Sequence, residues 1–216
     1  MNCTKRSKTN DLFELIAWGR EELLRAGVEE GREECERILM KFLGCSRSEI
    51  YLKEHEPIKR DIRERFLGIL EKRIQRMPLA YLLKEANFWQ ETLYVDERCL
   101  IPRPETEILV EQVLKEFGEN APKAFSFLDV GTGSGAIAVA ILRACGNARA
   151  TLLDVSGEAL EVARLNIEKY GLQDRAILVE GDIFKGLSPK GVRHLFYENK
   201  KRSQTPSPLP GGEGRV

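Results

Sequence analysis

The sequence predicts an α/β protein: an N-terminal helical bundle followed by the first half of a doubly wound parallel sheet, in the order strand, helix, strand, helix, strand. Three observations predict it. Apolar residues recur at helical spacing through residues 11–76, short apolar segments alternate with helical ones after residue 124, and a glycine-rich turn follows the first of those segments.

Composition is that of an ordinary globular protein. The chain has 216 residues, 42% of them apolar and 31% charged, with a formal net charge of zero. No overall field therefore attracts nucleic acid or an anionic membrane. Five cysteines are scattered without a C-x-x-C pair, which argues against a disulfide framework or a zinc site and fits a reducing compartment. No apolar run approaches the roughly 18 residues of a membrane span, so we expect a cytoplasmic protein.

Residues 11–76 predict helices with local stop and start signals. Asn10 or Asp11 can cap the first helix, and "SRSE" at 46–49 has the spacing of a capping box. A longer helix should end before Pro78, because proline disfavours helical backbone in the residue that precedes it. Nothing in this bundle carries chemistry, so we interpret it as a recognition or packing module.

The pattern changes in the segment that follows the bundle. "NFWQETLYVDERCLIP" alternates aromatic and β-branched residues, and the turn-capable pair Asp96-Glu97 predicts a short β-hairpin with its turn there. Pro104 suits the first position of a helix, which should run to Gly118. "AFSFLDV", "ATLLDV" and "AILVEGD" are then predicted strands, separated by helices over 134–144 and 156–170. This spacing predicts parallel strands with right-handed crossovers.

A glycine loop follows the first predicted strand. Gly131, Gly133 and Gly135 remove side chains where the backbone must turn sharply, and they would let a ligand lie against it. The alternative is that the glycines merely permit a tight turn from strand to helix. In such a sheet, ligands bind beyond the carboxyl ends of the strands, which is where this loop lies.

Each of the three predicted strands ends in an aspartate: Asp129, Asp154 or Asp182. Asp154 follows Gly131 at the distance where a ribose diol would be hydrogen-bonded, and Asp182 is placed to reach an adenine amino group. Each aspartate alone could instead be a strand-terminal turn or a helix cap.

The loop spacing separates two nucleotide ligands. Dinucleotide loops read G-x-G-x-x-G, whereas this one reads G-x-G-x-G and is preceded by Asp129. A diphosphate beside that carboxylate would be repelled, and a ligand carrying an ammonium and a sulfonium would be attracted. The charge therefore favours S-adenosylmethionine over a nicotinamide dinucleotide.

The motifs together resemble a known family. "LIPRPETEILVE", "FLDVGTGSGAIAVAIL", "LLDVSGEALEVARLNIEKYGL" and "VEGDIF" are similar to the release-factor glutamine methyltransferases, the HemK/PrmC family, and "PLAYLLKEANFW" resembles that family's linker. The likeness covers about residues 10–187. It implies the sheet of a class I S-adenosylmethionine-dependent methyltransferase. It also implies the family's reaction, the transfer of methyl to the glutamine amide of a Gly-Gly-Gln loop in peptide-chain release factors. The helical domain is implied to help dock that partner.

The resemblance also implies which residues bind the donor. The loop would line its methionine and ribose, Asp129 would lie near its amino group, Asp154 would bind the ribose hydroxyls, and Asp182 with Ile183 would border the adenine. The implied cofactor-binding residues are Asp129, Gly131, Thr132, Gly133, Ser134, Gly135, Asp154, Asp182 and Ile183.

Some features stay open or depart from the family pattern. Arg103 in "IPRPETE" either contacts the ligand or forms a structural salt bridge with Glu105 or Glu107. Lys84 and Gln90 stand where relatives often have glycine.

One departure from the family pattern concerns catalysis. The family carries an Asn-Pro-Pro-Tyr motif shortly after "GDIF", and this motif orients the weakly nucleophilic amide nitrogen toward the methyl group. No Asn-Pro-Pro occurs in these 216 residues. The resemblance therefore implies that no catalytic residues are present, and we expect this chain to be inactive.

We predict four segments: a helical partner-docking domain (1–78), a β-hairpin linker (79–104), a partial methyltransferase domain (105–187), and a disordered tail (188–216) rich in Pro, Ser and Gly. We expect the family sequence to have been lost near residue 187, so that "AFSFLDV" forms an unpaired sheet edge.

Two other functions remain as alternatives. One is a nucleic-acid amino-methyltransferase, which "IPRPETE", the helical domain and the neutral charge disfavour. The other is a non-catalytic remnant that binds the donor or a release factor. We expect release factors as partners, and neither nucleic acid nor membrane.

Overall fold

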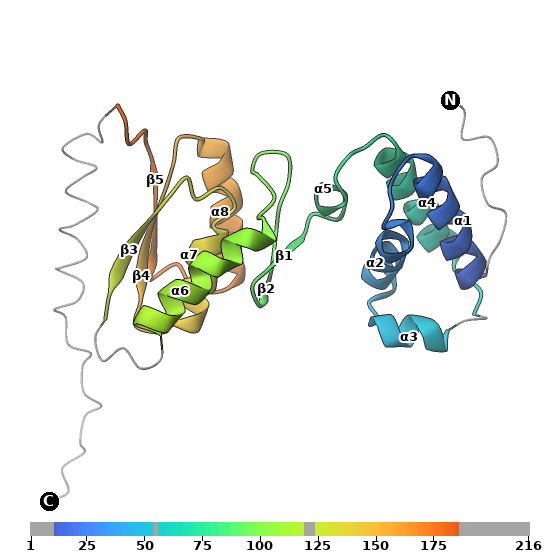
Figure 1. Cartoon of the computed structure of the whole chain (residues 1–216), viewed down its shortest axis with the longest axis horizontal. Coiled ribbons are helices and arrows are strands. Elements are labelled where there is room, and N and C mark those ends of the chain that lie inside the picture. The colour runs from blue at the N-terminus through green and yellow to red at the C-terminus, as the bar shows by residue number, and fades with distance from the viewer. Residues whose placement is uncertain (1–10, 54–55, 119–123, 186–216) are drawn as a thin grey trace, which may run out of the picture. The chain divides into compact units, whose positions relative to one another are not determined.

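The structure is a computed structural model that describes residues 11–53, 56–118 and 124–185 (Figure 1). These residues form two compact units. The first comprises the described residues up to Ala86 together with Val95–Glu97, and the second comprises Asn87–Tyr94 and those from Arg98 onward. The division falls within the predicted linker, 79–104, whereas the four predicted boundaries themselves stay predictions. The predicted tail lies outside the described residues.

The first unit is helical. Its helices are α1 (Leu12–Arg25), α2 (Gly31–Leu43), α3 (Arg47–Leu52), α4 (Arg60–Ile74) and α5 (Leu79–Leu83). Their apolar stripes meet in one core, whose fully buried members include Leu15, Leu23, Ile38, Leu39 and Phe66. Asp11 caps α1 by accepting hydrogen bonds from the N–H groups of Phe13 and Glu14, at 2.9 and 3.0 Å. Ser46 and Glu49 form the predicted capping box of α3.

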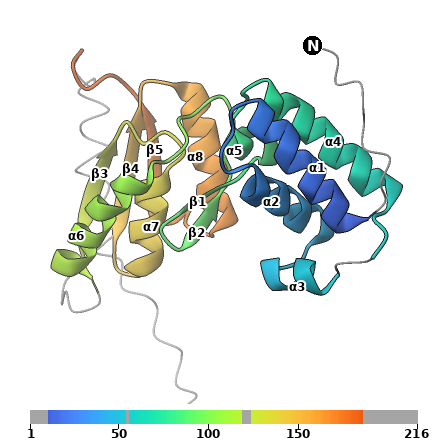
Figure 2. The ribbon, with the colours of Figure 1, turned by 45° about the vertical axis from the view of Figure 1, so that its right-hand side comes forward.

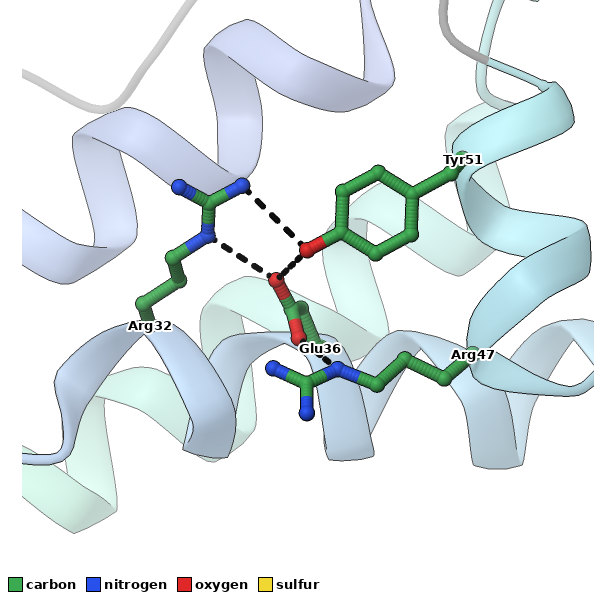
Figure 3. Close-up of polar contacts among 4 residues, drawn as sticks. All are labelled: Arg32, Glu36, Arg47 and Tyr51. Atoms are coloured by element: carbon green, nitrogen blue, oxygen red, sulfur yellow. Dashed lines mark hydrogen bonds and ion pairs between the residues drawn. The ribbon is translucent and has the colours of Figure 1, made fainter.

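A buried carboxylate joins α2 to α3. Glu36 is 2% exposed and accepts hydrogen bonds from Arg32 Nε (3.0 Å), Arg47 Nε (2.8 Å) and the Tyr51 hydroxyl (2.9 Å). Figure 3 shows the three donors converging on the carboxylate from both helices. Burial raises the pKa of Glu36, but the three hydrogen bonds outweigh it and leave this pKa below its ordinary value.

The second unit contains a parallel sheet. In chain order it has β1 (Ala86–Phe88), β2 (Glu91–Leu93), the 3₁₀ turn η1 (Pro104–Thr106), α6 (Glu107–Phe117), β3 (Ser126–Val130), α7 (Ala136–Ala144), β4 (Arg149–Asp154), α8 (Gly157–Lys169) and β5 (Ala176–Glu180). Strands β3, β4 and β5 pair in that order, all parallel. Figures 1 and 2 show α6, α7 and α8 on one side of this sheet. The predicted α/β class is confirmed.

Strand β3 lies at one edge of the described sheet, because only β4 pairs with it among the described residues. Leu128 and Val130 remain 38% and 49% exposed. The sequence predicts an edge at this strand. None of the helices in the described ranges is long and apolar enough to span a membrane.

The hairpin exists, but its predicted turn is wrong. The turn lies at Trp89-Gln90, and Asp96 is buried in the segment that follows β2. Tertiary contacts select this turn: Trp89 adopts a positive φ of 56°, and its N–H donates to the Glu107 carboxylate at 2.9 Å. The hydroxyl of Tyr170, which directly follows α8, accepts from Thr92 N–H at 3.0 Å and donates to Thr92 C=O at 2.8 Å. Turn propensity alone favoured Asp96-Glu97 because it takes no account of these partners.

Candidate functional site

The glycine loop connects β3 to α7 and is folded back onto β4. Gly131, Gly133 and Gly135 have φ angles of +70°, +56° and +78°, a region that side chains disfavour. The N–H groups of Gly131 and Thr132 both donate to the Leu153 carbonyl, at 2.8 and 3.1 Å. The alternation of glycines in the sequence therefore corresponds to three left-handed positions in one turn.

The three glycines face different surroundings. A Cβ atom on Gly135 would lie 3.3 Å from Ala163 Cβ and from Leu152 Cδ2, so this glycine is needed for packing against α8 and β4. A Cβ atom on Gly131 or Gly133 would meet nothing within 4 Å. The loop thus makes a tight turn and also leaves open space beside its backbone.

Asp129 lies beneath the loop rather than at its surface. Its side chain is 6% exposed and accepts the Thr132 hydroxyl at 2.7 Å. Burial raises the pKa of Asp129, and the negative charge of Asp154 adds to the rise, while hydrogen bonds from Thr132 and from the Ala138 N–H oppose it. Because Gly135 at the N-cap has no side chain, Asp129 satisfies this N–H in the first turn of α7.

Asp154 connects the loop to the start of α8. Its Oδ2 accepts the Gly133 N–H at 2.8 Å, and its Oδ1 accepts the Ser156 N–H at 3.0 Å. Asp154 is partly exposed, in contrast to Asp129. Asp154 is therefore close enough to Asp129 for its negative charge to contribute to the raised pKa of Asp129.

Asp182 and Ile183 lie at the same edge of the sheet. The Gly181 N–H donates to the Asp154 carbonyl at 2.9 Å, which brings the segment after β5 beside Asp154. Asp182 Oδ1 accepts the Phe184 N–H at 2.9 Å, and its Oδ2 lies 3.4 Å from Lys185 Nζ, so the carboxylate now supports a local turn. Ile183 is 44% exposed. The hydrogen bonds connect Asp129, the loop and Asp154, whereas the adenine-binding role of Asp182 and Ile183 stays a prediction.

The "IPRPETE" segment holds the hairpin. Its last residue, Glu107, accepts the Trp89 N–H where that backbone has positive φ. Arg103 is exposed, and within the described residues no ion pair joins it to Glu105 or Glu107. The salt bridge considered for Arg103 is therefore not formed, and the structural contact of this segment with the hairpin is made by Glu107.

A surface cavity of about 630 Å³ lies elsewhere in this unit, on α8 and β5. Its lining residues are Arg98, Gly157, Glu158, Leu160, Glu161, Arg164, Leu178 and Glu180. None of the predicted site residues lines it. Among the described residues, no group of three His, Cys, Asp or Glu side chains is arranged to hold a metal ion.

Comparisons with known proteins bear on both units. Residues 14–83 match the PrmC N-terminal domain, and residues 127–193 match a methyltransferase domain. A release factor glutamine methyltransferase from Chlorobaculum tepidum is 39% identical over 72% of this chain and 54% of its own length. Those from Rhodopirellula baltica and Deinococcus radiodurans are 34% and 36% identical, each over 87% of this chain and over 64% and 66% of their own lengths.

The chain belongs to the release factor glutamine methyltransferase family. It spans between about half and two thirds of the length of the family members cited above. The methyltransferase-domain match continues to residue 193, so the expected loss of family sequence near residue 187 stays a prediction. Among solved structures, precorrin-6Y C5,15-methyltransferase from Geobacter metallireducens is 22% identical over 44% of this chain and 46% of its own, with a TM-score of 0.34, a likeness too low to add to the assignment.

Sequence reasoning missed one residue that contacts the glycine loop. Asn166 lies in the buried stripe of α8 with Val162, Ala163 and Ile167, and it donates to the Ser134 carbonyl at 2.9 Å. The available signal was an asparagine in an otherwise apolar helical stripe, since a buried amide needs partners. The pattern could not identify those partners, because they lie 32 and 72 residues away in the chain.

Proposed function

We propose that the glycine loop binds S-adenosylmethionine. Gly131 and Gly133 leave open space beside the backbone, where side chains would otherwise project. The adjoining carboxylates of Asp129 and Asp154 suit the ammonium and sulfonium groups of this donor and oppose a dinucleotide's phosphates. The observation that carries the proposal is that the loop has open space beside Gly131 and Gly133 while its Gly133 N–H donates to the partly exposed carboxylate of Asp154.

The role proposed for each residue follows from how accessible its side chain is. Asp154 is accessible and would accept the ribose hydroxyls, since each carboxylate oxygen keeps a lone pair beyond its backbone hydrogen bond. Asp129 is buried and already accepts hydrogen bonds, so it would act through its charge rather than by direct contact. Asp182 and Ile183 would border the adenine at the neighbouring strand end.

We propose that the reaction of the family is the one this site serves: transfer of a methyl group to the side-chain nitrogen of a release-factor glutamine, in the cytoplasm. Bound S-adenosylmethionine would supply an electrophilic methyl group. The helical unit would dock the release factor, and we expect no direct contact with nucleic acid. Because the sequence contains no Asn-Pro-Pro-Tyr to orient the acceptor amide, we expect this chain to bind the donor without transferring methyl.

Isothermal titration of the 216-residue chain with S-adenosylmethionine tests donor binding. We expect one site, competition by S-adenosylhomocysteine, and no heat from a nicotinamide dinucleotide. Asp154→Ala should weaken binding by at least about tenfold, the usual effect of losing hydrogen bonds to a charged group. Glu180→Ala, which removes an exposed carboxylate at the neighbouring strand end, is the matched control.

Radiolabelled methyl transfer to a purified release factor tests the activity. Donor binding with no transfer is the expected result. Transfer at a rate comparable to that of a full-length relative would overturn the expected inactivity, and transfer to DNA or RNA would favour the nucleic-acid alternative. Binding to the release factor without the donor would favour a pure interaction module.

A further inference from the structure

Asn166 is an isolated polar group in an apolar environment. Its side chain is 0% exposed, and its neighbours on the buried face of α8 are aliphatic. Burying an amide in such a place is unfavourable unless its hydrogen-bonding groups are satisfied. The side chain is therefore placed there for the partners it reaches.

Those partners lie on two segments distant in sequence. Asn166 Nδ2 donates to the carbonyls of Ser134 and Tyr94, both at 2.9 Å, and its Oδ1 accepts the Tyr94 N–H at 2.7 Å. Ser134 lies in the glycine loop, and Tyr94 directly follows β2. One side chain thus uses both its donor hydrogens and its acceptor to connect the loop to the hairpin.

The contact with Ser134 completes a two-sided hold on the loop. Asp154 accepts the Gly133 N–H from one direction, and Asn166 donates to the carbonyl of the next residue from α8. Glycines on either side of Ser134 would otherwise leave this part of the backbone unusually free. Ordering a loop before the ligand arrives improves affinity, because the entropy of ordering is not lost on binding.

We propose that Asn166 is a positioning residue of the donor site, which holds the Gly133–Gly135 backbone in the conformation that receives the methionine part of S-adenosylmethionine. The inference rests on the proposed function, because it takes the loop to be the donor site. Asn166 acts through Ser134 and does not touch the donor.

Two variants and a matched control test the proposal. Asn166→Asp keeps the acceptor for Tyr94 and replaces the donor of the Ser134 bond, whereas Asn166→Ala removes both. Tyr170→Phe is the control: this residue directly follows α8, and the change removes both hydrogen bonds between its hydroxyl and Thr92 of the same hairpin, without contact to the loop. Thermal unfolding identifies the variants that fold.

Titration calorimetry should show S-adenosylmethionine binding weakened about tenfold in both Asn166 variants and unchanged in Tyr170→Phe. Adenosine, which lacks the methionine part, should lose less affinity than S-adenosylmethionine does. Hydrogen exchange of the peptide covering 131–135 should rise in both Asn166 variants and stay unchanged in Tyr170→Phe, and this measurement needs no donor.

Unchanged loop exchange in Asn166→Ala would overturn the positioning role, whatever the binding results. Equal weakening in Tyr170→Phe would also overturn it, because general loosening of the unit would then explain the effect. Failure of the unaltered chain to bind S-adenosylmethionine would instead contradict the proposed function, and with it the donor-site role of Asn166.

Discussion

Each of the two units contains a carboxylate that accepts more than one hydrogen bond, but the two carboxylates differ in their donors and in their exposure. Glu36 in the helical unit accepts three side-chain donors, from Arg32, Arg47 and Tyr51 (Figure 3). Asp154 in the sheet unit accepts two backbone N–H groups and remains partly exposed. The first carboxylate is enclosed by side chains of its own unit, whereas the second remains partly accessible to solvent.

This difference shows how a stabilising carboxylate can be distinguished from one available to a ligand. Side-chain donors from two helices converge on Glu36, so a ligand there would have to displace them. Backbone donors approach Asp154 only from the loop and helix side, which leaves its remaining lone pairs accessible. Hydrogen-bond geometry, rather than burial alone, separates the two cases.

The largest expected effect concerns Gly135, the loop glycine that packs against α8 and β4. Gly135→Ala should lower the free energy of unfolding by about 2–4 kcal/mol, because it combines left-handed backbone strain with crowding against Ala163 and Leu152. Urea denaturation measures this change. Gly131→Ala, with similar φ but open surroundings, should cost only about 1–2 kcal/mol. Equal costs would contradict the distinction between the packed and open sides of the loop.

The next effect concerns Glu36, the carboxylate that side-chain donors enclose. Glu36→Gln should cost about 1–3 kcal/mol, since a buried charged acceptor of three hydrogen bonds is lost. Glu33→Gln on the exposed side of the same helix is the control and should change the stability by less than about 0.5 kcal/mol. S-adenosylmethionine affinity should be unaltered in both; weakened binding in Glu36→Gln would argue that the cluster serves the site.

The pH dependence of stability extends this prediction. Because the pKa of Glu36 lies below its unfolded value of 4.5, its stabilising contribution is complete above that pH and is lost as the pH falls through the folded pKa. Denaturation between about pH 7 and about pH 3 should therefore show a smaller loss of stability on acidification in Glu36→Gln than in the unaltered chain. Identical acid profiles would contradict the lowered pKa.

A pair of glycines compares the two units directly. Gly133 and Gly44 both have positive φ, +56° and +62°, and a Cβ atom on either would meet nothing within 4 Å. Gly133→Ala and Gly44→Ala should each cost about 1–2 kcal/mol of stability. Only Gly133→Ala should weaken S-adenosylmethionine binding, which calorimetry measures. The same loss of affinity in Gly44→Ala would mean that the effect reports stability and not the site.

The smallest expected effect is a gain. Lys84 follows α5 as its C-cap with a φ of +56°, at a position where relatives often have glycine. Lys84→Gly should raise the free energy of unfolding by about 0.5–1 kcal/mol by relieving this strain, since its ion pair with Glu97 is exposed and contributes little. Lys84→Ala loses the same ion pair without relieving the backbone and should show no gain.

Local interactions in this chain were predictable from sequence. The Asp11 cap and the Ser46-Glu49 capping box involve residues within a few positions of each other, so their spacing identifies them. The alternation of strands and helices after residue 124 predicted the parallel order of β3, β4 and β5, because short crossovers allow little else. The glycine turn was also recognisable, because Gly131, Gly133 and Gly135 lie on alternate positions of one short segment.

Contacts between distant segments were not predictable. The hairpin turn lies at Trp89 because Glu107 accepts its N–H from 18 residues away, and no propensity scale includes that bond. The sequence offered Glu105 and Glu107 as ion-pair partners for Arg103, yet neither salt bridge forms in the described residues. Asn166 was visible only as an asparagine in an apolar stripe.

By itself, the sequence determined the helices and the parallel strands, where the glycine turn lies, and to which family the chain belongs. These depend on periodicity, local capping and motif spacing, all of which are written along the chain. Only the tertiary structure decided which loop glycine packs against α8 and β4, and which carboxylate is enclosed by side-chain donors. Those properties depend on what lies across space from each residue, and a linear pattern does not contain that information.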